Sequence, residues 1–190
     1  MTGRPLRPDL ARSLVERAES DEGFRKRWLL GQLSDQEQAH GMLQHQADAQ
    51  VLDRILAEHG WPTRPLVGAD GATAAWRLAL HADRTPHLQY RALQALGTAA
   101  SLDAELLSHW AHLYDRYRVV TGQQQVYGTQ HRLEQGQLTR LPVGSPELLD
   151  SRRASVGLPP ADTAQRALHQ RLAQLAVPVS GTVLAGSAAA

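Results

Sequence analysis

Hydrophobic residues recur every three or four positions along most of this chain, which is the spacing of one helix face. Between these stretches stand glycine, proline, serine and threonine, the residues that start and stop helices. The stretches expected to be helical are residues 8–30, 35–59, 72–81, 86–99, 101–120, 146–155 and 161–176. We therefore predict a mostly α fold, a single-domain bundle of six or seven helices.

Three helix starts are marked by capping residues. Ser34 is followed three positions later by Glu37, which is the pattern of a capping box. Thr85 precedes Pro86, so Thr85 is expected at the N-cap and Pro86 in the first turn. Ser101 is expected to cap the helix that follows it.

The helical period is lost after Gly122, in the segment GQQQVYGTQ. We predict at most one short β-hairpin near residues 126–141, with strands at 126–131 and 137–141. A loop rich in glutamine with a tyrosine and glycines is as typical of a binding site as of a surface turn. Residues 1–7 are expected to form a flexible lead, residues 8–176 the helical domain, and residues 177–190 a disordered tail of small residues.

Two of the helices carry polar stripes. On the 35–59 helix the polar stripe is either one wall of a cleft or metal site, or a solvated face. On the 101–120 helix the polar stripe is expected to face water. The apolar residues expected to pack are Leu43, Ala47, Val51, Leu52, Ile55 and Leu56 in the first, and Leu102, Leu106, Trp110, Leu113 and Tyr117 in the second. The polar stripes are Glu37, His40, Gln44 and Asp48, and Glu105, His109, His112 and Arg116.

Composition narrows the function classes. The chain is 42% hydrophobic and 21% charged, as in a soluble globular protein, and its net charge is +1 with no dense basic run. Nucleic acid is therefore not expected as the main partner. The absence of cysteine excludes disulfides, thiolate catalysis and cysteine-type zinc sites. Neither a signal peptide nor a membrane span is recognisable, so we expect a cytoplasmic protein.

The stretch from Gly60 to Asp83 places a histidine and a carboxylate at a helix-to-helix corner. Gly60 stops one helix, and residues 72–80 resume the helical period around Trp76. His81 and Asp83 then close this second helix. Because imidazole titrates near neutral pH, His81 is either a general acid/base or a residue that ties two helices together.

Six motifs follow one another through most of the chain: GWPT, VG-x-x-GA-x-AAW, HAD, L-x-DR, Q-x-YGTQ and SPELLDSRRASVGLPP. Together they resemble a bacterial family of uncharacterised proteins known only as a domain of unknown function. The resemblance spans roughly residues 35–160, and the ordered set is specific where a single motif is weak. It implies no established activity, but it indicates which residues recur as a set, and we expect the corner and the loop to form one site. These residues are Asp35, Gln36, His81, Asp83, Asp115, Arg116, Gln125, Tyr127, Gly128 and Gln130.

The chain departs from the family pattern at four positions. His45 and Asp48 stand where members usually carry an aspartate and an asparagine. Leu80 replaces a glutamine, and Arg84 an acidic or polar residue. Such departures fit a specialised paralogue, for example a tailoring enzyme of a biosynthetic pathway.

We expect a cofactor-independent enzyme acting on a small polar molecule. His81 would be the general acid/base, with Asp83 or Asp115 orienting its ring. Arg116 would hold a carboxylate or phosphate. The remaining substrate-binding residues would be Gln36, Trp61, Gln125, Tyr127 and Gln130. This hypothesis requires His81, Arg116 and Tyr127 to face one cavity.

Two alternatives stay open. A metal-dependent enzyme would bind a divalent cation through His45, Asp48, His81 and Asp83. A non-catalytic helical binding module would scatter the polar residues over different faces and expose an apolar patch.

Overall fold

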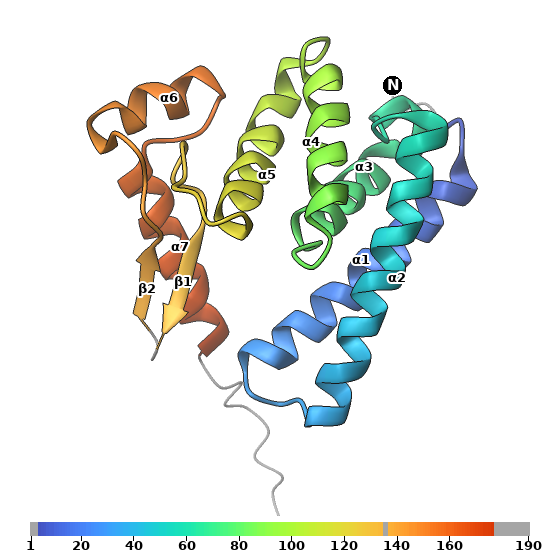
Figure 1. The fold of residues 1–190 in the computed structure, drawn as a ribbon, viewed down its shortest axis with the longest axis horizontal. Coiled ribbons are helices and arrows are strands. Elements are labelled where there is room, and N and C mark those ends of the chain that lie inside the picture. Colours follow the sequence, from blue (N-terminus) through green and yellow to red (C-terminus); the bar gives the residue numbers. More distant parts are fainter. Residues whose placement is uncertain (1–3, 135–136, 177–190) are drawn as a thin grey trace, which may run out of the picture.

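The structure is a computed structural model that describes residues 4–134 and 137–176. Within these residues the chain is mostly helical, with seven α-helices and one two-stranded antiparallel hairpin, which confirms the predicted fold class (Figure 1). The helices are α1 (Pro8–Leu29), α2 (Asp35–His59), α3 (Arg64–Leu80), α4 (Pro86–Ala100), α5 (Leu107–Val120), α6 (Leu149–Ser155) and α7 (Ala161–Ala176). The strands are β1 (His131–Glu134) and β2 (Gln137–Arg140), and short 3₁₀ helices at Ala104–Leu106 and Pro146–Leu148 lead into α5 and α6.

Helices α1 to α5 enclose the main hydrophobic core. Its largest fully buried apolar side chains are Leu14, Leu52, Leu88, Leu96 and Leu113, which come from α1, α2, α4 and α5. Helix α3 contributes mainly alanines to this core. Burial of these leucines is worth about 2 kcal/mol each, so the core fixes the relative positions of the five helices.

Helices α1 and α3 cross closely because α3 carries a glycine at the contact. A Cβ on Gly71 would lie 3.2 Å from the Cα of Ala11. Ten residues further along both helices, Asp21 of α1 contacts His81 at the end of α3. The two helices therefore run in the same direction, and their close contact brings these two side chains together.

Helix α2 begins as predicted but packs differently over its first half. The Ser34 hydroxyl accepts a hydrogen bond from Glu37 N, and the Glu37 carboxylate accepts one from Ser34 N, so the capping box is confirmed. The predicted packing position Leu43 is wrong, since its side chain is 67% exposed. Asp48 is buried instead, and Arg17 of α1 donates to its carboxylate at 2.6 Å. A partner from another helix thus determines which face is inside.

The corner between α3 and α4 largely follows the prediction. Helix α3 starts earlier than expected, at Arg64, and bends at Gly68, whose φ of +75° suits glycine. His81 occupies its C-cap. Thr85 precedes α4 as predicted, but its hydroxyl donates to Ala82 O rather than accepting from the helix.

The connection from α4 to α5 differs from the prediction. Helix α4 continues to Ala100, so Ser101 is a C-cap and not the start of the next helix. Asp103 caps the 3₁₀ turn that precedes α5. Leu102, predicted to pack, is 87% exposed. Gly97 lies inside α4, where its missing side chain leaves room for the Trp110 ring of α5.

The hairpin exists, with a shorter first strand than predicted. Strand β1 begins at His131 and pairs with Arg140 of β2 at that end. The segment before it, residues 125–130, is held by buried side chains, as described below. The predicted turn at 134–136 falls largely outside the described residues. Helices α6 and α7 follow as expected.

The two ends of the chain are only partly described. Leu6 N and Arg7 N donate to Pro65 O and Leu66 O, so residues 4–7 of the predicted lead lie against the start of α3. The predicted tail, 177–190, lies outside the described residues. None of the helices in residues 4–134 and 137–176 combines the length and apolar composition that a membrane crossing requires.

Candidate functional site

A buried carboxylate on α1 is shared by two histidines. The side chain of Asp21 is only 2% exposed. His81 Nδ1 lies 2.5 Å from its Oδ2, and His45 Nε2 lies 2.8 Å from its Oδ1. Burial raises the pKa of Asp21, but the close polar contacts and the electrostatic attraction of His45 and His81 outweigh burial and hold the pKa below its ordinary value. Asp21 is therefore ionised at neutral pH.

The two histidines contact Asp21 in different ways. His81 has hydrogen-bond geometry, whereas the His45 contact is close but misaligned and leaves His45 Nε2 and Asp21 Oδ1 without a hydrogen bond. The Phe24 ring packs edge-on against His45 at a centroid distance of 5.1 Å. The second ring nitrogen of His81, Nε2, forms no hydrogen bond with a described residue. It is also not one of the buried, solvent-inaccessible polar atoms that lack a hydrogen-bond partner. It therefore faces accessible space.

Asp83 and Arg116 form a second pair beside the first. Arg116 Nε donates to Asp83 Oδ1 at 2.7 Å, and its Nη2 donates to Oδ2, so the pair is bidentate. The buried amide of Gln89 lies 3.4 Å from Asp83 Oδ1. Because both oxygens of Asp83 are engaged, it does not orient His81, and Arg116 is not left to bind a substrate anion with these two donors.

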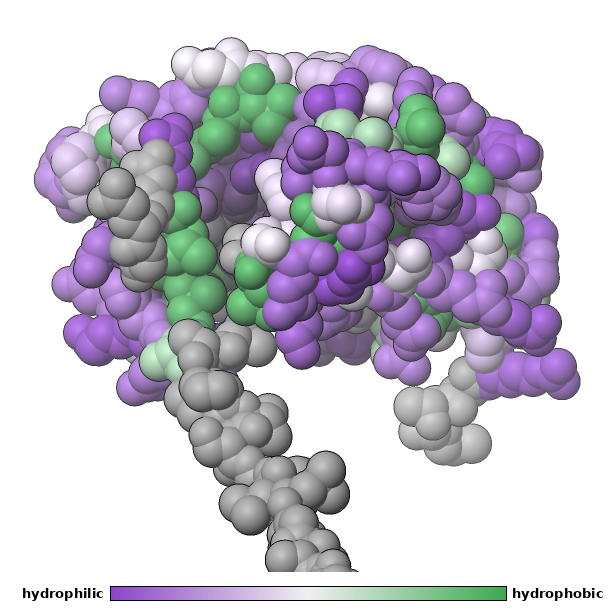
Figure 2. Space-filling model, turned by 90° about the horizontal axis from the view of Figure 1, so that it is seen from below, coloured by the Kyte–Doolittle hydropathy of each residue, from purple (hydrophilic) through white to green (hydrophobic). Residues whose placement is uncertain are grey.

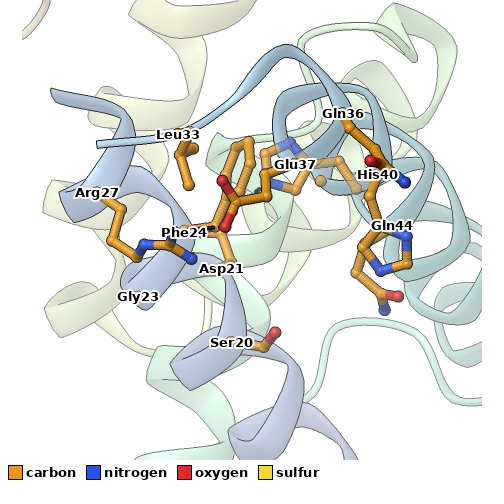
Figure 3. Close-up of a pocket in the computed structure, with 12 residues that line it drawn as sticks. Ser20, Asp21, Gly23, Phe24, Arg27, Leu33, Gln36, Glu37, His40 and Gln44 are labelled. Atoms are coloured by element: carbon orange, nitrogen blue, oxygen red, sulfur yellow. Dashed lines mark hydrogen bonds and ion pairs between the residues drawn. The ribbon is translucent and has the colours of Figure 1, made fainter. Parts of the chain in front are cut away.

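A cavity of about 570 Å³ opens between the C-terminal half of α1 and the start of α2. In Figure 3, Arg27 and Glu37 point toward one another, and His40 and Gln44 lie on the α2 side, across from Ser20. Its lining is Ser20, Asp21, Gly23, Phe24, Arg27, Leu33, Gln36, Glu37, His40, Gly41, Gln44 and His45. Three members of the polar stripe on α2 thus line a cleft, and Asp21 and His45 reach it.

The lower face of the molecule is also hollowed (Figure 2). Seen from below, the surface recedes between the side that carries the hairpin and α7 and the side formed by α1 and α2 (Figure 2). In Figure 1 the α3–α4 corner and the C-terminal end of α5 point toward this face.

Asp115, predicted to be catalytic, anchors the loop after α5. It is fully buried and accepts hydrogen bonds from Val126 N (2.8 Å), Tyr127 N (3.0 Å), Thr129 N (2.9 Å) and Thr129 Oγ1 (2.9 Å). Both oxygens are therefore occupied by the loop. We assign Asp115 to positioning residues 126–129 and not to proton transfer.

Gln125 and Gln130 of the loop also position the backbone through buried hydrogen bonds. Gln125 donates to Gln130 O and Leu141 O and accepts from Gln130 N, which fastens the loop to the segment after β2. Gln130 donates to His112 O. The Gln125 amide is therefore fully engaged within the protein, and the Gln130 NH₂ is engaged by His112 O and Thr129 Oγ1.

Tyr127 lies away from His81 and Arg116. Its ring contacts Trp110 and Tyr114 of α5, with centroid distances of 6.1 and 6.3 Å. Arg116 follows Tyr114 by two positions, so it points to another side of the helix. Burial, then the charge of Asp115, raises the pKa of Tyr127. The expectation that these three groups face one cavity is not met.

The prediction that the polar stripe of the 101–120 helix faces water is wrong. Trp76 stacks on His109 at 4.4 Å and meets His112 edge-on at 5.8 Å. Burial lowers the pKa of His112 to about 4. Only Glu105 of this stripe is exposed.

The remaining predicted residues divide between core and cavity. Trp61 is 5% exposed within the hydrophobic core, so it packs rather than binds a ligand, whereas Gln36 lines the cavity. The proposed metal set does not converge: His45 and His81 contact Asp21, Asp48 pairs with Arg17, and Asp83 with Arg116. Within the described residues no group of three or more histidine or acidic side chains is arranged to hold a metal ion.

Sequence reasoning missed Asp21 and Arg25. Both continue the apolar stripe of α1 that includes Leu14 and Ala18, at spacings of three and four residues. A charged residue within a buried stripe is the pattern that indicates them.

Residues 8–175 match a family of unknown function, DUF6624. The chain belongs to the DUF6624 family. No curated protein and no solved structure matches this chain.

Proposed function

We propose that this protein is an enzyme that uses His81 as a general acid/base on a small polar molecule. The observation that supports this most is the hydrogen bond between His81 Nδ1 and the buried carboxylate of Asp21. A carboxylate accepts, so Nδ1 carries the proton and Nε2 presents its lone pair. Since Nε2 faces accessible space, it is the atom that would exchange a proton with a substrate.

Asp21 takes the orienting role that was predicted for Asp83 or Asp115. It fixes the tautomer of His81 and, being ionised, stabilises the imidazolium that forms when Nε2 accepts a proton. The Asp83–Arg116 pair holds the corner on which His81 sits.

A specialised substrate fits one further feature. His45, where the chain departs from the family pattern, contacts the same carboxylate and lines the cavity. The departure therefore falls within the site, which supports a tailoring role in a biosynthetic pathway.

The test combines a substrate screen with two variants. A panel of small carboxylates, phosphates, amino acids and amides is incubated with the protein and followed by proton NMR. The wild type should convert at least one compound, and His81→Gln should lower its rate by about 100-fold or more. His87→Gln is the matched control, because His87 is exposed on α4. No conversion by the wild type, or full activity in folded His81→Gln, would contradict the proposal.

The tautomer gives a check that needs no substrate. Nitrogen-15 NMR of the imidazoles should show His81 protonated at Nδ1 at alkaline pH in the wild type. In Asp21→Asn this preference should weaken. A wild-type His81 protonated at Nε2 would remove the lone pair on which the mechanism depends.

A further inference from the structure

Arg25 stands beside the Asp21–His81 pair. It follows Asp21 by four residues on α1, so the two side chains share one face of the helix. Its side chain is partly buried. Arg25 interacts electrostatically with Asp21, Asp83 and Arg116.

The guanidinium of Arg25 has no acceptor among the described residues. Other partly or fully buried arginines among the described residues do have acceptors: Arg17 donates to Asp48, Arg116 to Asp83, and Arg153 to Tyr127 O and Pro159 O. No hydrogen bond or ion pair joins Arg25 to a described residue. None of its three side-chain nitrogens is one of the solvent-inaccessible polar atoms that lack a hydrogen-bond partner. Its donors therefore point into accessible space.

The two neighbouring carboxylates are already engaged. Asp21 Oδ2 hydrogen-bonds His81, Asp21 Oδ1 lies 2.8 Å from His45 Nε2, and both oxygens of Asp83 are held by Arg116. Burial lowers the pKa of Arg25 and the positive charge of Arg116 adds to this, whereas the charges of Asp21 and Asp83 oppose it. A partly buried cation next to a second cation is stabilised by an added anion.

We propose that Arg25 binds an anionic group, a carboxylate or a phosphate, of the molecule on which His81 acts. The inference rests on the proposed function and names its substrate class. A guanidinium matches the two oxygens of either group with parallel N–H donors, at hydrogen-bond distances of about 2.8 Å. Arg25 thereby replaces Arg116, which sequence reasoning assigned to this task.

The test measures anion binding without turnover. Inorganic phosphate and acetate are titrated separately into the full-length protein at constant ionic strength with chloride, and the arginine side-chain Nε–H resonances are followed by NMR. One resonance, absent in Arg25→Gln, should shift on saturation with at least one anion. Arg25→Gln should weaken that binding at least tenfold, and Arg25→Lys by less. Arg84→Gln is the control, an exposed arginine at the same corner, and should bind as the wild type does.

The two titrations distinguish the kinds of anion, and stability separates binding from structure. Tighter binding of acetate indicates a carboxylate substrate, and tighter binding of phosphate a phosphorylated one. Because Arg25 has no internal acceptor, Arg25→Gln should unfold in urea at the same or a higher concentration than the wild type. No response to either anion, or equal binding by Arg25→Gln, overturns the subsite. Both outcomes leave the His81 test standing, since that test fails only on the turnover and tautomer of His81.

Discussion

Replacing Asp115 by asparagine should destabilise the protein strongly, because one carboxylate holds the whole loop after α5. Asparagine has nearly the same shape and keeps one acceptor oxygen, which can still serve Val126 N and Tyr127 N. Its amide NH₂ would then meet Thr129 N, which donates to Asp115 at 2.9 Å in the wild type. Two donors would face each other in a fully buried position.

The loss in the free energy of unfolding follows from the hydrogen bonds that Asp115→Asn removes. Hydrogen bonds to a charged group are worth about 1.5–3 kcal/mol each, and a buried donor left unsatisfied costs about 1–3 kcal/mol. One bond lost and the others weakened gives about 3–4 kcal/mol in the free energy of unfolding. For a protein of this size that corresponds to a fall in Tm of about 10 °C.

Urea denaturation followed by tryptophan fluorescence measures this loss, and hydrogen exchange of residues 126–129 shows whether the loop opens. Asp103→Asn is the matched control, because Asp103 is exposed and its carboxylate accepts from Glu105 N alone. It should cost less than about 1 kcal/mol. A loss below 1 kcal/mol in Asp115→Asn would refute the loop anchor. If that stable variant also lost activity, the catalytic role predicted for Asp115 would be restored.

Two further predictions concern a buried histidine and a buried glycine. The pKa of His112 is about 4 when folded and about 6.5 when unfolded, so the unfolded chain binds more protons in this window. The free energy of unfolding should therefore fall as pH drops from 6.5 to 4, by up to about 3 kcal/mol. Measured by urea unfolding, the stability of His112→Phe should depend less on pH than that of the wild type. A pH dependence equal to that of the wild type contradicts this prediction. A Cβ on Gly41 would lie 2.0 Å from the Phe24 ring, so Gly41→Ala should displace the ring and cost about 1–2 kcal/mol. Gly23→Ala, which meets no atom within 4 Å, should instead gain about 0.5–1 kcal/mol, and equal effects of the two in urea would argue against the steric account.

The parts of the fold set by neighbouring residues could be predicted. The Ser34–Glu37 capping box and the start of α4 after Thr85 involve groups within three residues of each other. Helix α7 and the limits of α1 also follow from local periodicity. These features need no knowledge of what packs where.

Burial of polar groups could not be predicted in the same way. Leu43 is exposed and Asp48 is buried because Arg17, 31 positions away, supplies the partner. The contact between Asp21 and His81 spans 60 positions. His81 was identified from its place at the helix corner, but the carboxylate that orients it belongs to a helix whose register depends on the α1–α3 contact.

The energetics of Asp21 support the proposed role of this residue in proton transfer. Removing a carboxylate from water costs several kcal/mol, and the hydrogen bond with His81 and the close contact with His45 return only part of that. An apolar side chain would continue the stripe of Leu14 and Ala18 without this cost. Arg25 adds a second unfavourable choice on the same helix face, since its guanidinium lacks an internal acceptor among the described residues. Stability alone favours neither residue. Both residues fit the proposed function, in which Asp21 orients His81 and Arg25 binds an anionic group of the substrate.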